Sequence, residues 1–191
     1  MRRIAVAVLL AGWACASRTA IERVRAYRAA VDRGDETAIA RDLAPNARIW
    51  YEKKEGPGDP LTTGGGSWKH WDSFFHSRSR LGGWRSEGTR VSAVVHETND
   101  FYALLDWTPA PYSMTWWLDR EGRVAEVLVE SIPGAKATSR FDDFKRWAYE
   151  KHPDEMKDLL PNGKIDPTGD RAERWVPLLR EWRREAGLPP K

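Results

Sequence analysis

The stretch YRAAVDRGDETAIARDLAPNARI, residues 27–49, decides the fold, because it holds the end of one helix, a short second helix and the start of a strand. From residue 17 up to this stretch, apolar residues recur every three or four positions, which predicts one amphipathic helix. Gly34 is placed to end that helix, and Asp35 is placed to cap the next one. The following ARIWYE, residues 47–52, predicts a first strand.

Downstream, the pattern stays helical at first and then changes to the alternation of strands. After a polar loop rich in glycine and proline, WKHWDSFF predicts a helix from Trp68 to about Arg78, with Ser67 as its cap. Gly82 and Gly83 are expected to end this unit. Alternating patterns then predict four strands, at residues 89–97, 101–109, 112–119 and 123–132.

This order of elements predicts the fold class and the domains. Helices followed by consecutive strands with short turns are typical of an α+β fold, with the helices on one face of a curved antiparallel sheet. The tail, residues 133–191, carries amphipathic helical patterns and too few apolar residues for a core of its own. We therefore expect one domain over residues 17–132 and a helical C-terminal extension packed on it.

Residues 1–16 have the features of an export signal peptide. MRR is a positively charged start, residues 4–14 are apolar, and ACA is a small-x-small cleavage site. The apolar run is too short to span a bilayer as a helix. We expect cleavage after Ala16 and a periplasmic or secreted protein that begins at Ser17.

The single cysteine, Cys15, leaves a second interpretation open. GWAC would serve as a lipoprotein site, with Cys15 lipidated and the chain anchored to a membrane. Removal of the leader would take away Arg2 and Arg3 and no acidic residue. Of the 31 basic residues, 29 would then remain against 28 acidic ones, a net charge of +1. No nucleic-acid partner is expected, because nucleic-acid binding requires a clustered basic face.

The order of elements resembles the NTF2-like superfamily, also called SnoaL-like or ketosteroid-isomerase-like. Residues 27–49 and LDREGRVAEVLV, residues 118–129, carry the resemblance, which extends over roughly residues 18–132. It implies a cone, in which a curved sheet wraps around a long helix and leaves a pocket at the open end. It also implies that the chain can form a homodimer, as many members do. Members include isomerases, cyclases, dehydratases and non-catalytic binders, so the fold does not decide the function.

The resemblance also implies positions for an isomerase site. Tyr27 lies where ketosteroid isomerases have their oxyanion-hole tyrosine. Their general-base aspartate corresponds to Tyr51, and their second, protonated aspartate to Met114. Two of the three positions depart from the family pattern, so steroid isomerase chemistry is not expected.

A different acid–base pair is predicted from the strands. Asp106 lies in LLDWTP among apolar residues, where a carboxylate would be partly desolvated and have a raised pKa. His96 ends the preceding strand and could approach it, so Asp106 is the candidate base and His96 its helper. Glu126 and Glu130 would join them if their shared strand face is the concave one. The alternative is that these carboxylates are structural or lie on the surface.

No metal site or cofactor is predicted. His70 and His76 are six residues apart and do not converge on a helix, while Asp72 with His76 makes only a helix-surface pair. The glycines at 64–66 lack the Lys-Ser/Thr pair of a phosphate loop.

Tryptophan is abundant, with 11 in the chain, and suggests a ligand pocket. The cone would bring together six aromatic residues from separate elements as an aromatic-lined pocket: Tyr27, Trp50, Trp71, Phe75, Trp107 and Trp116. The alternative is that they fill the cone completely.

Three functions follow from these patterns. The first is an exported protein that binds a small apolar or aromatic molecule, with Tyr27 as a hydrogen-bonding group. The second is an enzyme of the cyclase, isomerase or dehydratase kind that uses Asp106 and His96. The third is a non-catalytic interaction module of the cell envelope.

Overall fold

The computed structural model describes residues 4–63, 68–168 and 170–191, with side chains from Thr19 onward. The predicted cap Ser67 and the glycines at 64–66 lie outside the described residues. The chain folds into two compact units. Unit 1 contains residues 1–66, 80–95 and 111–133, and unit 2 contains residues 67–79, 96–110 and 134–191.

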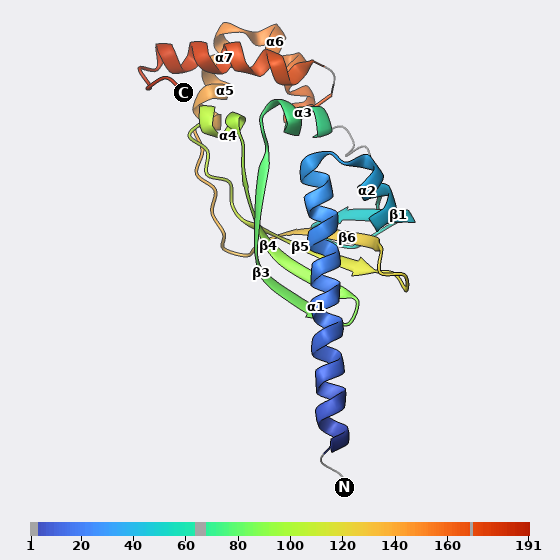
Figure 1. The fold of residues 1–191 in the computed structure, drawn as a ribbon. Coiled ribbons are helices and arrows are strands. Elements are labelled where there is room, and N and C mark those ends of the chain that lie inside the picture. The colour runs from blue at the N-terminus through green and yellow to red at the C-terminus, as the bar shows by residue number, and fades with distance from the viewer. Residues whose placement is uncertain (1–3, 64–67, 169) are drawn as a thin grey trace. The chain divides into compact units, whose positions relative to one another are not determined.

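Unit 1 begins with two helices and contains most of the sheet (Figure 1). Its elements are α1 (Ile4–Arg33), α2 (Glu36–Asp42), β1 (Leu43–Tyr51), β2 (Asp59–Pro60), β3 (Arg78–Glu87), β4 (Arg90–Thr98), β5 (Tyr112–Leu118) and β6 (Val124–Ser131). The helix boundaries predicted from residues 27–49 are confirmed. Gly34 adopts a φ of 65°, and the Asp35 Oδ1 accepts a hydrogen bond of 3.0 Å from the Ala38 N–H.

Among the described residues, the strands form one sheet in the order β2-β1-β6-β5-β4-β3. β5 pairs antiparallel with both β4 and β6, whereas β1 pairs parallel with β6. Only Gly88 and Thr89 separate β3 from β4, a connection short enough to make a hairpin. This element order confirms the predicted α+β fold class, whereas the parallel pairing of β1 with β6 departs from the antiparallel sheet that was predicted.

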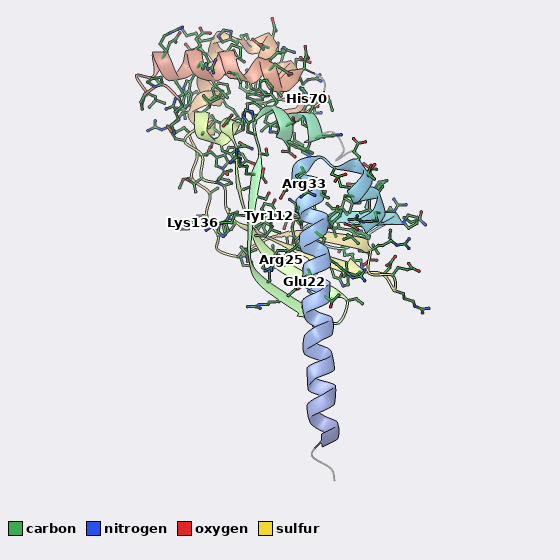
Figure 2. All side chains as sticks on the ribbon, in the orientation of Figure 1. Glu22, Arg25, Arg33, His70, Tyr112 and Lys136 are labelled. Carbon is green, nitrogen blue, oxygen red and sulfur yellow. The ribbon has the colours of Figure 1, made fainter. Side chains whose placement is uncertain are left out.

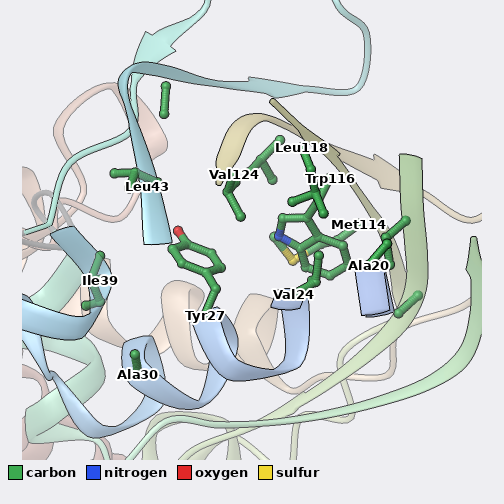
Figure 3. Packing of buried hydrophobic residues seen from close by; sticks show 14 of the residues in the cluster. Ala20, Val24, Tyr27, Ala30, Ile39, Leu43, Met114, Trp116, Leu118 and Val124 are labelled. Atoms are coloured by element: carbon green, nitrogen blue, oxygen red, sulfur yellow. The ribbon is translucent and has the colours of Figure 1, made fainter. Parts of the chain in front are cut away.

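The core of unit 1 lies between α1 and one face of the sheet. Val24 and Tyr27 of α1 share an apolar cluster with Met114 and Trp116 of β5 and with Val124 of β6 (Figure 3). The opposite face of α1 carries charged side chains. Glu22, Arg25 and Arg33 are exposed along this helix (Figure 2). The C-terminal half of α1 is therefore an amphipathic helix, as its spacing predicted.

The end of one predicted helix and the whole of one predicted strand are wrong. The helix from Trp68 ends at Phe74, because His76 takes a left-handed φ of 50° and β3 begins at Arg78. The glycines expected to end that unit, Gly82 and Gly83, lie inside β3. The predicted strand 101–109 was also wrong, as its first residues form a helix, α4 (Asp100–Leu104).

Local chemistry explains this short helix. The side chain of Asn99 caps α4 by accepting a hydrogen bond of 2.8 Å from the Tyr102 N–H. Phe101, Leu104 and Leu105 are buried at the three-to-four spacing of a helix, which a period-2 interpretation of FYALL overlooks. β4 therefore pairs directly with β5, and β3 lies on the other side of β4, at the edge of the sheet.

Unit 2 is helical. Its elements are α3 (Trp68–Phe74), α4, α5 (Phe141–Lys151), α6 (Pro153–Leu159), the 3-10 helix η1 (Pro161–Gly163) and α7 (Arg171–Glu185). Phe144 and Trp175 from the tail share one buried cluster with Trp71, Phe75 and Phe101. The tail helices thus build their core together with α3 and α4, which the sequence prediction had assigned to the first domain. Within the described ranges, none of the helices combines the length and apolar character needed to span a bilayer.

Candidate functional site

The candidate site lies in the core of unit 1, around the side chain of Tyr27. This residue projects from the C-terminal part of α1 and is 5% exposed. Among the described residues, its hydroxyl makes no hydrogen bond. Burial raises the pKa of the Tyr27 hydroxyl above its ordinary value, and the charge of Arg28 opposes this only in part. The group therefore stays protonated at neutral pH and can donate a hydrogen bond.

Trp116 supplies a second donor in the same cluster. Its side chain is fully buried, and its indole Nε1–H has no hydrogen-bond partner among the described residues. In Figure 3 the indole nitrogen lies on the side of the ring that is turned toward Tyr27. Trp84 of β3 stacks on Trp116, with ring centroids 6.0 Å apart and planes 24° apart. An unpartnered buried donor is uncommon and calls for an explanation.

The apolar cluster reaches the surface on the inner face of the sheet. Ile49 of β1, Tyr112 of β5 and Val129 of β6 pack against it but are only partly buried. Tyr51, which follows Ile49 on the same face by strand alternation, is 59% exposed. The two buried donors are therefore surrounded by apolar side chains that continue to solvent.

The structure divides the six predicted aromatic residues between the two units. Tyr27 and Trp116 share the cluster of unit 1. Trp71, Phe75 and Trp107 belong to the aromatic cluster of unit 2, where the Trp71 and Phe75 rings lie 4.7 Å apart.

Trp50 lies on the outer face of the sheet. It pairs with Leu128, whereas its neighbour Ile49 pairs with Val127 of the core cluster. Its indole N–H donates to the Gly56 carbonyl at 3.3 Å, so it is held by its own loop.

The predicted environment of Asp106 is wrong. The residue follows α4 with a φ of 47° and is surrounded by cations. Lys191 Nζ lies 2.6 Å from its carboxylate, Arg183 Nη1 3.1 Å and Arg140 Nε 3.7 Å. The hydrogen bond from Lys191, helped by Arg183, holds the pKa of Asp106 below its ordinary value, although burial opposes this shift.

His96 does not join Asp106. It is exposed on β4, and no hydrogen bond or ion pair links the two side chains among the described residues. Glu126 and Glu130 also lie on the outer face, since they alternate with Val127 and Val129 of the core face. Glu126 forms an ion pair with Lys54. The acid–base pair predicted from the strands therefore lacks the geometry on which it rested.

The comparisons with known proteins concern the fold. No family model matches the chain, and no curated protein matches it. A protein of unknown function with a cystatin-like fold from Methylobium petroleophilum PM1 is 12% identical, covers 68% of this chain and 90% of its own, and has a TM-score of 0.49. A candidate polyketide cyclase from Sinorhizobium meliloti is 15% identical, covers 57% of this chain and 94% of its own, and has a TM-score of 0.45.

A candidate isomerase of the SnoaL-like family from Agrobacterium tumefaciens str. C58 is 17% identical to this chain. The match covers 59% of this chain and 96% of that one, with a TM-score of 0.44. All three structures share less than 20% of their residues with this chain, so the likeness concerns the fold alone.

Proposed function

We propose that unit 1 binds a small apolar molecule that carries a hydrogen-bond acceptor, such as a ketone or quinone oxygen. The observation that carries the proposal is the Trp116 indole N–H, which is buried without a hydrogen-bond partner among the described residues. It shares its apolar cluster with the buried side chain of Tyr27, for whose hydroxyl no hydrogen bond is found among the same residues. Both groups are neutral, which suits a carbonyl oxygen. The apolar side chains around them suit the carbon skeleton of such a ligand.

The supporting energetics are simple. A buried donor without an acceptor costs about 1–3 kcal/mol in lost hydration. A ligand oxygen placed between the two donors would recover part of this free energy. Ile49, Tyr112 and Val129, the partly exposed members of the same cluster, would then cover the rest of the ligand.

The alternative of a SnoaL-like enzyme has lost its predicted base. Asp106 belongs to unit 2, and its pKa is lowered by cations that hold it ionised. A carboxylate in this state is a weak base, since efficient general bases have pKa values near the working pH. Binding is therefore the function that we propose for unit 1.

The binding experiment uses an aromatic ketone, 6-propionyl-2-dimethylaminonaphthalene, whose fluorescence reports an apolar environment. We expect saturable binding to the wild-type protein. Tyr27→Phe should weaken it about two- to tenfold, the value of one neutral hydrogen bond. Tyr51→Phe is the matched control, because this tyrosine is exposed, and it should bind like the wild type. Absence of saturable binding, or equal affinity of the two variants, would contradict the proposal.

We also propose that the chain is exported and loses its leader after Ala16. The basis is the sequence pattern of residues 1–16. The experiment is the native mass of the protein, produced with its own leader in a bacterial host. A chain that begins at Ser17 would support export, a lipidated Cys15 would support the anchored form, and an intact leader would refute both. A small mass that leaves on denaturation would reveal a natural ligand.

A further inference from the structure

A second polar site lies within unit 2, separate from the residues of the proposed binding site. A cavity of about 450 Å³ is lined by His76, Arg78, Thr98, Asn99 and Asp100. These residues come from two short segments, one that follows α3 and enters β3, and one that ends β4 and starts α4. A cavity of this size is large enough for a small organic molecule.

Hydrogen bonds hold the two segments together. The Asp100 N–H donates to the Phe75 carbonyl at 2.9 Å, and the Asn99 side-chain amide donates to the Ser77 hydroxyl at 3.3 Å. Asn99 is buried, and its other amide atom caps α4. The two segments that line the cavity are therefore held together before any ligand arrives, although the side chains of His76 and Asp100 are 71% and 61% exposed.

His76 is oriented in this frame by its neighbour. Its Nδ1 lies 2.7 Å from Asp100 Oδ2. An ionised carboxylate only accepts hydrogen bonds, so Nδ1 carries a proton and Nε2 is left for another partner. The positive φ of His76, 50°, is a backbone conformation that non-glycine residues adopt at some cost, and such residues concentrate at functional sites.

Two further groups of the cavity have no partner among the described residues. These are the guanidinium of Arg78 and the hydroxyl of Thr98, both exposed. A guanidinium presents five N–H donors in a planar fork that matches the two oxygens of a carboxylate or phosphate. Asp100, the one acidic residue of the lining, is already bonded to His76.

From this arrangement we infer that the cavity binds a small organic oxyanion. Arg78 provides the fork, Thr98 adds a hydroxyl donor, and the imidazole of His76 borders the same cavity. Asp100 acts as a positioning residue, because it bonds to His76 and sets which imidazole nitrogen faces the cavity. The shared chemistry of the ligand is a terminal anionic group with two or more oxygens, as in a carboxylate or a phosphate monoester.

The experiment is a titration of the full chain with two aromatic probes, benzoate and phenyl phosphate. The readout is the imidazole nitrogen signals in two-dimensional NMR, which distinguish His76 from the other three histidines once His76→Asn identifies its signal. Asparagine accepts a positive φ, so this variant keeps the backbone. We expect a saturable shift of the His76 signal with at least one probe, and the tighter probe indicates whether the site prefers carboxylate or phosphate.

Arg78→Gln should weaken binding about tenfold or more, as expected for a lost hydrogen bond to a charged group. Arg180→Gln is the matched control, because Arg180 is an exposed arginine of α7 in the same unit. Circular dichroism checks that both variants fold. No saturable shift with either probe, an Arg78→Gln variant that binds like the wild type, or equal weakening by Arg180→Gln would overturn the inference.

Discussion

The substitution Asp106→Asn separates a structural role of this residue from a catalytic one. The carboxylate of Asp106 accepts hydrogen bonds from Lys191 Nζ at 2.6 Å and from Arg183 Nη1 at 3.1 Å. The Arg183 side chain is almost fully buried, with 3% of it exposed. Asparagine keeps the shape and tolerates the φ of 47°, so the substitution removes the negative charge and little else.

The expected loss of stability is about 2 kcal/mol at pH 7. Removing one partner of a buried ion pair costs about 3–5 kcal/mol. Here the cost is smaller, because Arg183 still donates to the carbonyls of Leu104 at 2.8 Å and Pro189 at 2.7 Å. Lys191 and Arg140 are 40% and 50% exposed, so their ion pairs contribute at most about 1 kcal/mol each.

The same interactions predict how the difference in unfolding free energy between the wild type and Asp106→Asn depends on pH. The pKa of Asp106 is lower in the folded chain than in the unfolded chain, where it is about 3.9. The stabilisation is therefore fully present above pH 4 to 5. It is lost as the pH falls through the lowered folded pKa, where the carboxyl becomes neutral like the amide.

The assay is urea unfolding of both proteins at several pH values, followed by tryptophan fluorescence. Asp154→Asn is the control, because this aspartate is 94% exposed and its one ion pair among the described residues is with Lys157 on its own helix. The control should match the wild type within about 0.5 kcal/mol. Equal stability of wild type and Asp106→Asn at pH 7, or a difference that does not shrink in acid, would refute the structural role.

Two further predictions concern unit 1. Gly58→Ala should destabilise the protein by about 1–3 kcal/mol more than Gly56→Ala in chemical unfolding. Both glycines have a φ near 65°, but of the two only Gly58 would place the new Cβ 2.5 Å from the buried Trp50 ring. Equal losses of unfolding free energy in the two variants would contradict this prediction, because they would mean that the Trp50 ring moves aside at little cost. Tyr27→Phe should leave the unfolding free energy within about 0.5 kcal/mol of the wild type, because the hydroxyl has no partner to lose among the described residues, and a loss above about 1 kcal/mol would reveal a hydrogen bond.

The sequence by itself determined the local elements of unit 1. The end of α1 at Gly34, the cap at Asp35 and the strands β4, β5 and β6 all follow from spacing and capping within a few residues. The failures were also local in origin. At residues 101–109 a short helical pattern was mistaken for alternation, and before β3 the left-handed residue His76 was not foreseen.

Tertiary structure alone decided the candidate site. Strand alternation predicts which neighbours of Trp50 and Trp116 share a face with each of them, but it does not relate the faces of two different strands. The pairing of β1 and β5 with β6 shows that Trp50 and Trp116 lie on opposite faces of the sheet. Asp106 and Arg183 are 77 positions apart, so no local pattern could predict that a cation lowers the pKa of that carboxylate. Pairing and ion-pair partners depend on which distant segments fold against each other, and that choice is made by the burial of the whole chain and not by any short stretch of it.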